Sequence, residues 1–283
     1  MSGLFHFFPI VAVLFYLSAS LSYARDLFSS ERKMGESYGR AMLAAGIVFH
    51  IVALLFEEIL LLLSRGSSAV ELTPSFPYTL SLIACLLVGC FLLIERRMNL
   101  GALGTFVSPL ALGFMVFSGV MFHFGGGSPV PDVAGDPLLL LHISFTILGH
   151  VAFGFAFGVS LGLLLQESLI RSKRFSEMGR KLPSIRLLDR LNRNFLVGGL
   201  VSMSIGVALG FYFGALRDVL VFGQGSRIYW TFITLAIYAA LVVGMLSKGL
   251  RGSRAAWLSI AGFSSVIASF VAVHVLGGGF HVH

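Results

Sequence analysis

Long apolar stretches separated by short polar segments dominate the chain. Eight such stretches of roughly 20 residues occur, and each is long enough to cross a hydrocarbon core about 30 Å thick. They lie at about residues 4–24, 41–63, 76–94, 102–122, 138–165, 195–216, 228–247 and 255–276. The pattern predicts an all-α integral membrane protein, a bundle of about eight transmembrane helices formed by a single polytopic domain over residues 1–283.

Lysine and arginine are unequally divided between the segments that alternate with these stretches. Of the 20 basic residues, all fall on one side except Arg65, Arg217 and Arg227. The basic side is expected to face the cytoplasm, which puts both chain ends outside. The net charge of +7 is then a topology signal and gives no support to nucleic-acid binding. Anionic lipid headgroups are the expected partner of this charge.

The longest basic loop contains an amphipathic pattern. Its apolar residues recur at three- and four-residue steps, opposite three arginines: Leu182, Ile185, Leu188, Leu191 and Phe195 against Arg186, Arg190 and Arg193. Pro183 suits a first helical turn. We expect one amphipathic helix that lies at the cytoplasmic interface and leads into the sixth stretch. A positive-inside anchor explains it as well as a partner site does.

Glycine repeats every four residues in the fifth and sixth stretches, at Gly154, Gly158 and Gly162 and at Gly206, Gly210 and Gly214. Such a repeat lines one helix face, where a neighbouring backbone can approach closely. We interpret these faces first as packing seams. A bare glycine face also suits a flat ligand such as a porphyrin, and the two interpretations are compatible.

Two of the eight histidines fall near the middle of the predicted membrane. His50 lies about ten residues into the second stretch and His150 about 13 into the fifth, or roughly 15–19 Å from a membrane edge at 1.5 Å per residue. Imidazole is costly to bury in a bilayer, so both are candidates for axial ligands of a haem iron or for a proton path. The alternative is that each hydrogen-bonds a carbonyl or hydroxyl of a neighbouring helix.

The remaining histidines gather near the outer ends of the stretches: His6, His123, His142, His274, His281 and His283. So many at one face favour a ligand site over isolated interfacial histidines. Haem iron accepts two axial imidazoles, and an apolar slot between helices covers the porphyrin. Zinc would more usually bring cysteine or carboxylate ligands in a tight cluster, for which none is spaced here. The pattern predicts a non-covalent, b-type haem near the outer face.

Two carboxylates accompany these histidines. Glu57 and Glu58 lie in the outer third of the second stretch, where an ionised carboxylate needs a partner or water. Arg217 or Arg227 could pair with one of them or with haem propionates, since guanidinium binds carboxylates bidentately. The two glutamates could also simply flank the headgroup region.

Three segments within residues 138–283 carry a family resemblance: LHISFTILGHVAFGFAFGVSLGLLLQESLIRSK, LPSIRLLDRL and RGSRAAWLSIAGFSSVIASFVAVHVLGGGFHVH. They resemble the later spans of the cytochrome c assembly family of haem-handling membrane proteins. In that family an LH at the start of the equivalent of the fifth stretch, and a GxGLH near the end of the last, supply the external axial ligands of a haem. The resemblance implies this role for His142 and His281, and a location in the bacterial cytoplasmic (inner) membrane.

One segment of the family is missing. Its haem synthetases carry a WGxxWxWD segment that presents haem to apocytochrome c, whereas the corresponding FGQGSRIYWTFITLAIYA holds Trp230 alone and no following aspartate. The family's further histidine near the inner end of the penultimate span has no match in LVVGMLSKGLRG. The pattern is similar to the small, eight-span HemX-like branch. It implies a haem carrier or accessory rather than a complete cytochrome c synthetase, with Trp230 among the candidate haem contacts.

Three functions stay open at this point. The first is a haem-binding protein for cytochrome c assembly or for control of tetrapyrrole synthesis, with assembly partners or a tetrapyrrole-synthesis enzyme at the cytoplasmic face. The second is an electron-transfer subunit with haem at the midplane, held by His50 and His150. The third is a structural or regulatory membrane protein without a cofactor. The sequence contains no order of residues typical of hydrolase or kinase catalysis.

Overall fold

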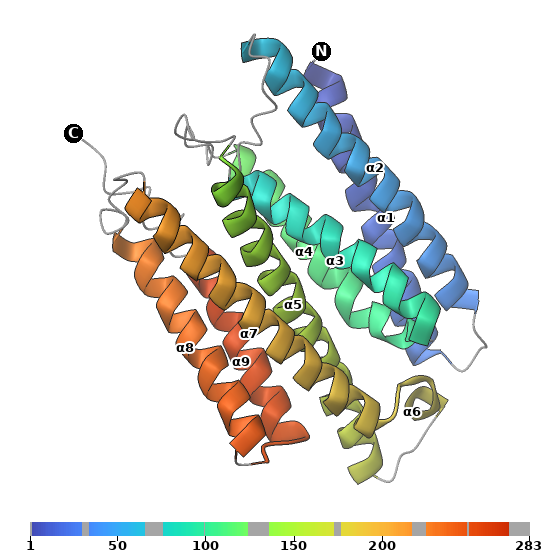
Figure 1. Ribbon diagram of the computed structural model, residues 1–283. Helices are drawn as coiled ribbons and strands as arrows, with labels where there is room; N and C mark the ends of the chain where they lie inside the picture. Colours follow the sequence, from blue (N-terminus) through green and yellow to red (C-terminus); the bar gives the residue numbers. More distant parts are fainter. Residues whose placement is uncertain are drawn as a thin grey trace. The chain divides into compact units, whose positions relative to one another are not determined.

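The computed structural model describes residues 2–29, 34–65, 76–98, 100–123, 136–172, 177–216, 225–247 and 249–271. Every regular element in these ranges is helical, which confirms the all-α prediction. In chain order they are α1 (Ser2–Phe28), α2 (Met34–Arg65), α3 (Phe76–Met98), the 3₁₀ turn η1 (Gly101–Leu103), α4 (Gly104–His123), α5 (Pro137–Arg171), α6 (Glu177–Lys181), α7 (Ile185–Leu216), α8 (Gly225–Ser247) and α9 (Ser253–Val271), as Figure 1 shows.

Each predicted stretch coincides with one long helix, although the fourth begins in η1 and the last continues past the described residues. Six of the described helices, α1 to α5 and α7, are long and apolar enough to cross a membrane. The apolar part of α8 is shorter, Phe232–Ser247. The count of eight spans and the outward position of both chain ends stay predictions.

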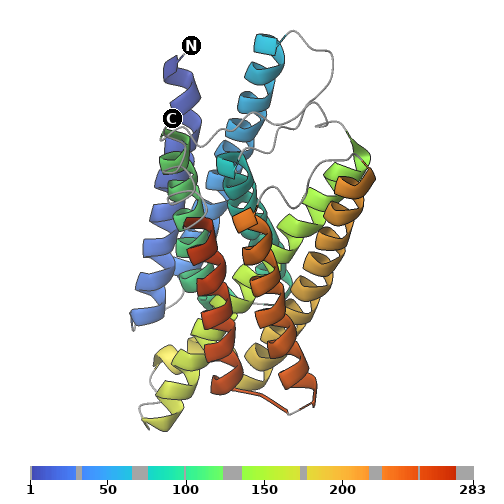
Figure 2. The ribbon, with the colours of Figure 1, turned by 90° about the vertical axis from the view of Figure 1, so that its left-hand side faces the viewer.

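The chain divides into two compact units, residues 1–135 with 165–184, and residues 136–164 with 185–283. In the first unit α1 runs beside α2, and α3 beside α4 (Figure 1). In the second, α8 and α9 form a helical hairpin, and α7 packs on α8 (Figures 1 and 2). A single domain over the whole chain stays a prediction.

Tyrosine rings set into glycine-lined slots hold the first unit together. An added Cβ at Gly39 would come within 2.9 Å of the Tyr23 ring, and one at Gly104 within 2.7 Å. Tyr16 fills a similar slot, because a Cβ at Gly46 would lie 2.8 Å from its ring. Both tyrosines are fully buried. The glycines therefore let α2 and α4 approach α1 more closely than any larger residue would allow.

The segment containing α6 joins the first unit through one lysine and one leucine. Lys181 donates hydrogen bonds to the carbonyl oxygens of Asp26 and Ser29 at the end of α1, and its Nζ lies 3.7 Å from the Asp26 carboxylate. A cation suits this end of a helix, where carbonyl groups lack intrahelical partners. The neighbouring Leu182 packs in a buried cluster with Leu27 and Ala102.

Glycines also form the seam between α5 and α7 in the second unit. A Cβ at Gly206 would lie 2.6 Å from Thr146 Oγ1, and one at Gly149 would lie 3.2 Å from the Met203 backbone nitrogen. Gly199 meets the Phe153 ring in the same way, at 2.5 Å. These contacts confirm the packing interpretation of the glycine repeat at Gly206.

The predicted interfacial helix is the first part of α7 and not a separate element. Leu188 and Leu191 are buried while Arg186 and Arg190 are exposed, so the amphipathic pattern is confirmed. The helix begins at Ile185 and continues without a break to Leu216. Leu182 and Pro183 precede it, so the prediction that Pro183 stands in its first turn is wrong. Nothing in residues 185–216 interrupts helical hydrogen bonding, because this stretch contains no proline.

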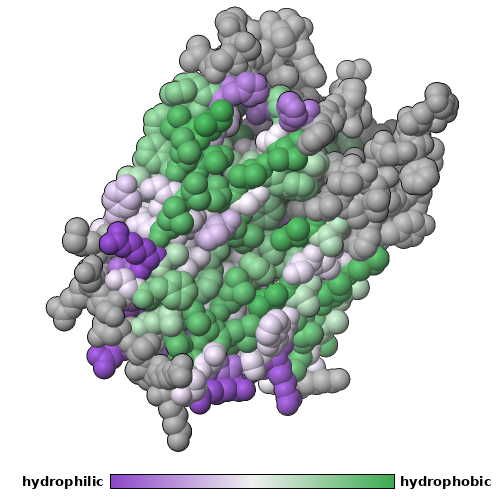
Figure 3. Space-filling view, turned by 180° about the vertical axis from the view of Figure 1, so that it is seen from behind, coloured by the Kyte–Doolittle hydropathy of each residue, from purple (hydrophilic) through white to green (hydrophobic). Residues whose placement is uncertain are grey.

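Most of the described surface on the face drawn in Figure 3 is apolar. Most of the exposed large hydrophobic side chains on the helices are leucine, isoleucine, valine and phenylalanine, among them Leu21, Leu55 and Leu93. A soluble protein rarely exposes apolar surface on this scale. The surface is therefore consistent with a protein whose helices contact lipid.

Candidate functional site

His142 lies in the second turn of α5, and the start of this helix is fixed by local sequence. Asp136 caps it by accepting a hydrogen bond from the backbone nitrogen of Leu138 at 2.9 Å. Pro137 occupies the first helical position, where its missing N–H costs nothing. The cap and the proline set the residue at which α5 begins. They therefore also set the position of His142 along the helix.

The imidazole of His142 packs on the glycine seam of α7. Its Nδ1 lies 2.6 Å from the carbonyl oxygen of Gly206. A Cβ at Gly210 would lie 2.7 Å from the ring atoms Cε1 and Nδ1. Gly210 therefore leaves the space that the ring occupies, and Gly206 supplies the acceptor that orients it.

This hydrogen bond fixes the tautomer of His142. A carbonyl oxygen only accepts, so Nδ1 carries the proton and the lone pair is on Nε2. Within the described part of the chain, Nε2 has no hydrogen-bond partner, and the side chain is half-buried. Histidines that ligate metals commonly have this arrangement, in which the second nitrogen donates to a carbonyl and holds the ring in place.

His150 lies two turns deeper on α5 and is buried. Its Nδ1 donates a hydrogen bond to the carbonyl oxygen of Thr146, at 2.8 Å, on the same helix. The alternative of a backbone hydrogen bond is therefore present in the structure, although the carbonyl belongs to α5 itself and not to a neighbour. Ligation of a midplane haem by His150 stays a prediction.

His50, on α2, is fully buried within the first unit, and both of its ring nitrogens are hydrogen-bonded. Nδ1 lies 3.0 Å from the hydroxyl of Tyr16 on α1, and Nε2 lies 2.8 Å from the hydroxyl of Ser81 on α3. A neutral imidazole donates through one nitrogen and accepts through the other, so one hydroxyl donates to the ring and the other accepts from it. His50 thus links three helices through the hydroxyl contacts weighed as the alternative to iron ligation.

Glu57 lines a cavity of about 530 Å³ in the first unit. His6 of α1 and His123 of α4 line the same cavity, so two of the predicted outer histidines share a site with one of the predicted carboxylates. Glu58, on the same helix, is buried. Pairing of Glu57 or Glu58 with an arginine stays a prediction.

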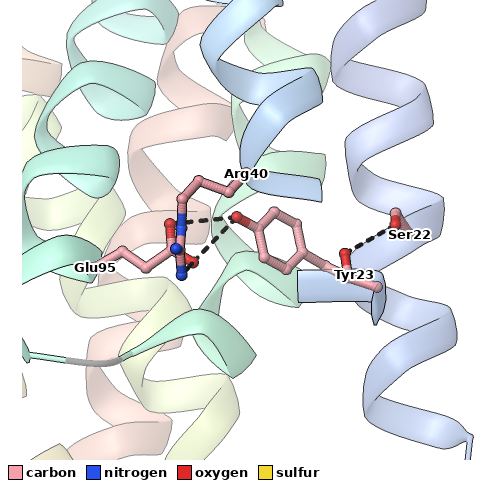
Figure 4. A network of polar contacts seen from close by, with 5 residues as sticks. Ser22, Tyr23, Arg40 and Glu95 are labelled. Atoms are coloured by element: carbon pink, nitrogen blue, oxygen red, sulfur yellow. Dashed lines mark hydrogen bonds and ion pairs between the residues drawn. The ribbon is translucent and has the colours of Figure 1, made fainter. Parts of the chain in front are cut away.

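Sequence reasoning missed a buried ion pair near the end of α3. Arg40 Nη2 lies 3.1 Å from Glu95 Oε1, and the Tyr23 hydroxyl donates to the same carboxylate at 3.3 Å (Figure 4). The Glu95 side chain is fully buried, whereas that of Arg40 is 36% exposed. A signal was available, because an acid and a base flank apolar stretches on the same predicted membrane side.

Two predicted haem contacts, His281 and Arg217, lie outside the described residues, as do the outer histidines His274 and His283. Arg227 and Trp230 lie in the first two turns of α8, where the structure describes the backbone alone. Of the two predicted axial ligands, the structure therefore describes His142.

The helices and the apolar surface define a polytopic, all-α membrane protein. A family model described as "Cytochrome C assembly protein" matches residues 75–281, which is most of the chain. The chain belongs to this family. The match begins well before residue 138, where the resemblance in the sequence starts, and α1 and α2 precede it.

Two relatives illustrate the match. Cytochrome c biogenesis protein CcsA of Parasynechococcus marenigrum (strain WH8102) is 24% identical over 213 residues, which cover 67% of this chain and 70% of the relative. Protein HemX of Brevibacillus brevis is 26% identical over 237 residues, which cover 81% of each chain. These relatives confirm the predicted resemblance to the HemX-like branch. No solved structure matches the chain.

Proposed function

We propose that this protein binds haem through His142 and His281 near the outer membrane face, and that it holds or passes haem for cytochrome c assembly or for control of tetrapyrrole synthesis. The observation that carries the proposal is the hydrogen bond from His142 Nδ1 to the Gly206 carbonyl. It leaves Nε2, the nitrogen that would bind iron, without a partner in the described part of the chain.

The residues around His142 fit an axial ligand. A ring held by a backbone carbonyl does not have to be ordered when iron binds, which lowers the entropic cost of ligation. The side chain is half-buried, so it is not sealed inside the bundle. His281 supplies the second imidazole, and Arg217 and Arg227 bind the propionates as bidentate cations.

The proposal gives the chain a carrier role rather than a synthetic one. His142 and His281 would both hold the iron of a bound haem, which would leave no open position on the iron for a substrate, so the arrangement suits holding haem more than activating a substrate. In the stretch that corresponds to the family's tryptophan-rich segment, Trp230 is the single tryptophan. We assign Trp230 to contact with a haem edge. The partners are cytochrome c assembly proteins or a tetrapyrrole-synthesis enzyme at the cytoplasmic face.

A midplane haem finds less support. Ligation by His50 would require its ring to give up a hydroxyl contact, to Tyr16 or to Ser81, inside a fully buried site. Leaving a buried hydroxyl without a partner costs about 1–3 kcal/mol. The electron-transfer alternative differs from the proposal in what it predicts: a second haem that is lost in His50→Ala or His150→Ala.

Haem stoichiometry of the purified protein tests the proposal. The native protein is expected to bind one haem and to show a Soret band that both His142→Ala and His281→Ala reduce strongly. The matched control is His150→Ala, which removes an imidazole from the same helix and leaves the band in place. A folded protein that takes up no added haem, or a Soret band that withstands both substitutions, would contradict the proposal.

A further inference from the structure

The first unit contains a cavity that the proposed haem site does not use. It lies between α1, α2, α3 and α4, and its volume of about 530 Å³ would hold a ring system with part of an alkyl tail. Much of the lining is apolar, from residues such as Val13, Ala53 and Met115. Ile10, Leu14 and Val116, which also line it, are exposed on α1 and α4. The cavity is therefore accessible from the lipid side of the unit.

Polar groups gather at few points of this lining. Glu57 contributes a carboxylate, His6 and His123 contribute imidazoles, and Tyr78 and Ser81 contribute hydroxyls. Tyr78 is buried, and Ser81 and Glu57 are half-buried. An apolar cavity with a small number of hydrogen-bonding groups is the usual form of a small-molecule site.

Ser81 connects the cavity to the buried histidine of the first unit. Its hydroxyl is hydrogen-bonded to His50 Nε2 at 2.8 Å, and His50 Nδ1 is hydrogen-bonded to Tyr16 at 3.0 Å. The three side chains form a continuous chain of exchangeable protons from the cavity wall to α1. These hydrogen bonds hold the Ser81 hydroxyl in a fixed position at the cavity wall.

We propose that this cavity binds the ring of a membrane hydroquinone, with its isoprenoid tail leaving between α1 and α4 into the lipid. The ring hydroxyls donate hydrogen bonds to the Glu57 carboxylate and to an imidazole or hydroxyl oxygen of the lining. The ring itself fills the apolar part of the cavity. The tail passes over Ile10, Leu14 and Val116.

Charge selects this ligand over other membrane molecules. The described lining of the cavity contains Glu57 and no lysine or arginine. A phospholipid phosphate or the two propionates of haem would therefore meet the Glu57 carboxylate, with the imidazoles of His6 and His123 as the basic groups of the described lining and no permanently charged cation. A hydroquinone is neutral and offers two hydroxyl donors, which suit the carboxylate and hydroxyl oxygens of the lining.

Binding of decylubiquinol to the full-length protein in phosphatidylcholine nanodiscs, under anaerobic conditions, tests the inference. Empty nanodiscs correct for partition into lipid. We expect saturable binding of one molecule per protein. Absence of saturable binding above the empty discs would overturn the proposal.

Two glycines of α4 provide a matched pair of variants. Gly119 lines the cavity and Gly113 does not, yet both are exposed and a Cβ at either meets nothing within 4 Å. Gly119→Leu is expected to weaken decylubiquinol binding at least about tenfold by occupying the cavity, whereas Gly113→Leu leaves it unchanged. Equal binding by the two variants would place the ligand elsewhere and overturn the proposal.

Glu57→Gln tests the polar end independently of the cavity volume. It removes the charged acceptor with little change of shape, and we expect about tenfold weaker binding. Unchanged affinity, or displacement of the probe by phosphatidylethanolamine or by haem, would overturn the assignment in favour of a lipid or haem site. Soret absorbance of the same samples reports haem binding separately, so each proposal can fail without the other.

Discussion

His50 and His142 are both histidines on long apolar helices, but their surroundings differ in one respect. His50 is fully buried and uses both ring nitrogens, to the hydroxyls of Tyr16 and Ser81. His142 is half-buried and uses only Nδ1, to the carbonyl of Gly206. The first imidazole is a structural link between helices. The second is held in one orientation, and the lone pair on its Nε2 is not used by a hydrogen bond in the described part of the chain.

The comparison teaches that hydrogen-bond occupancy, more than depth in the membrane, separates a structural histidine from a candidate ligand. Every intramembrane imidazole carries a desolvation cost, which hydrogen-bond partners such as the two hydroxyls at His50 reduce. Substitutions in the first unit are therefore expected to change stability and leave haem binding intact. Substitutions around His142 are expected to do the reverse.

The largest effect is expected from His50→Leu. Removal of the imidazole leaves the Tyr16 and Ser81 hydroxyls without this partner in a buried site, which should lower the free energy of unfolding by about 2–4 kcal/mol. Thermal unfolding in detergent measures the loss, and the Soret band should stay at the native intensity. A lost Soret band with unchanged stability would make His50 a ligand and break the comparison.

Gly210→Ala tests the other side of the comparison. The added methyl would lie 2.7 Å from the His142 ring, so the ring must move away from its hydrogen bond with the Gly206 carbonyl. Disturbing a group that orients a metal ligand typically weakens binding about 10- to 100-fold. Haem titration measures the change. The control is Gly198→Ala on the same helix, where a Cβ meets nothing within 4 Å and haem affinity should stay native.

Glu95→Gln is expected to destabilise the first unit by about 1–2 kcal/mol. The change weakens the ion pair with Arg40 and the hydrogen bond from Tyr23 inside the bundle, but Arg40 is 36% exposed and keeps part of its hydration. Glu167→Gln is the control, because its partner Arg171 is 72% exposed. Equal melting temperatures of the two variants would show that burial of the Glu95 ion pair does not increase the stability of the protein.

The smallest effect is expected from Lys181→Met, about 1 kcal/mol or less. The substitution keeps the aliphatic length and removes the cation that caps the last carbonyl groups of α1. Arg180→Met changes an exposed neighbouring cation and should have no measurable effect on stability. Urea or thermal unfolding of both variants measures the difference, and haem binding should be native in each.

The helices were largely predictable because the ends of an apolar stretch of membrane length lie close to the ends of the helix that it forms. Eight stretches were expected, and each coincides over most of its length with one described long helix. The first turns of α7 were expected as a separate interfacial helix, since their pattern is amphipathic and that of the following span is apolar. Backbone hydrogen bonding continues through this change of surroundings, so the boundary in polarity is not a boundary in structure.

The candidate site was predicted in part. The LH at the start of the fifth stretch indicated His142 through a family resemblance, and the glycine repeat indicated a seam at Gly206. The sequence did not predict that His142 and Gly206 contact each other. They are 64 residues apart, and their helices come together only in the folded protein. The pair of Arg40 and Glu95 was missed for the same reason, at a separation of 55 residues.

The sequence by itself determined the class of protein, the positions of its helices and the family to which it belongs, since these depend on local apolarity and on short motifs. Tertiary structure decided which polar groups satisfy one another. It gave His50 two hydroxyl partners and His142 one carbonyl, and it brought Glu57, His6 and His123 to one cavity. Hydrogen bonds act over about 3 Å, so only the packing of distant helices determines whether a histidine is already paired or remains able to bind a ligand.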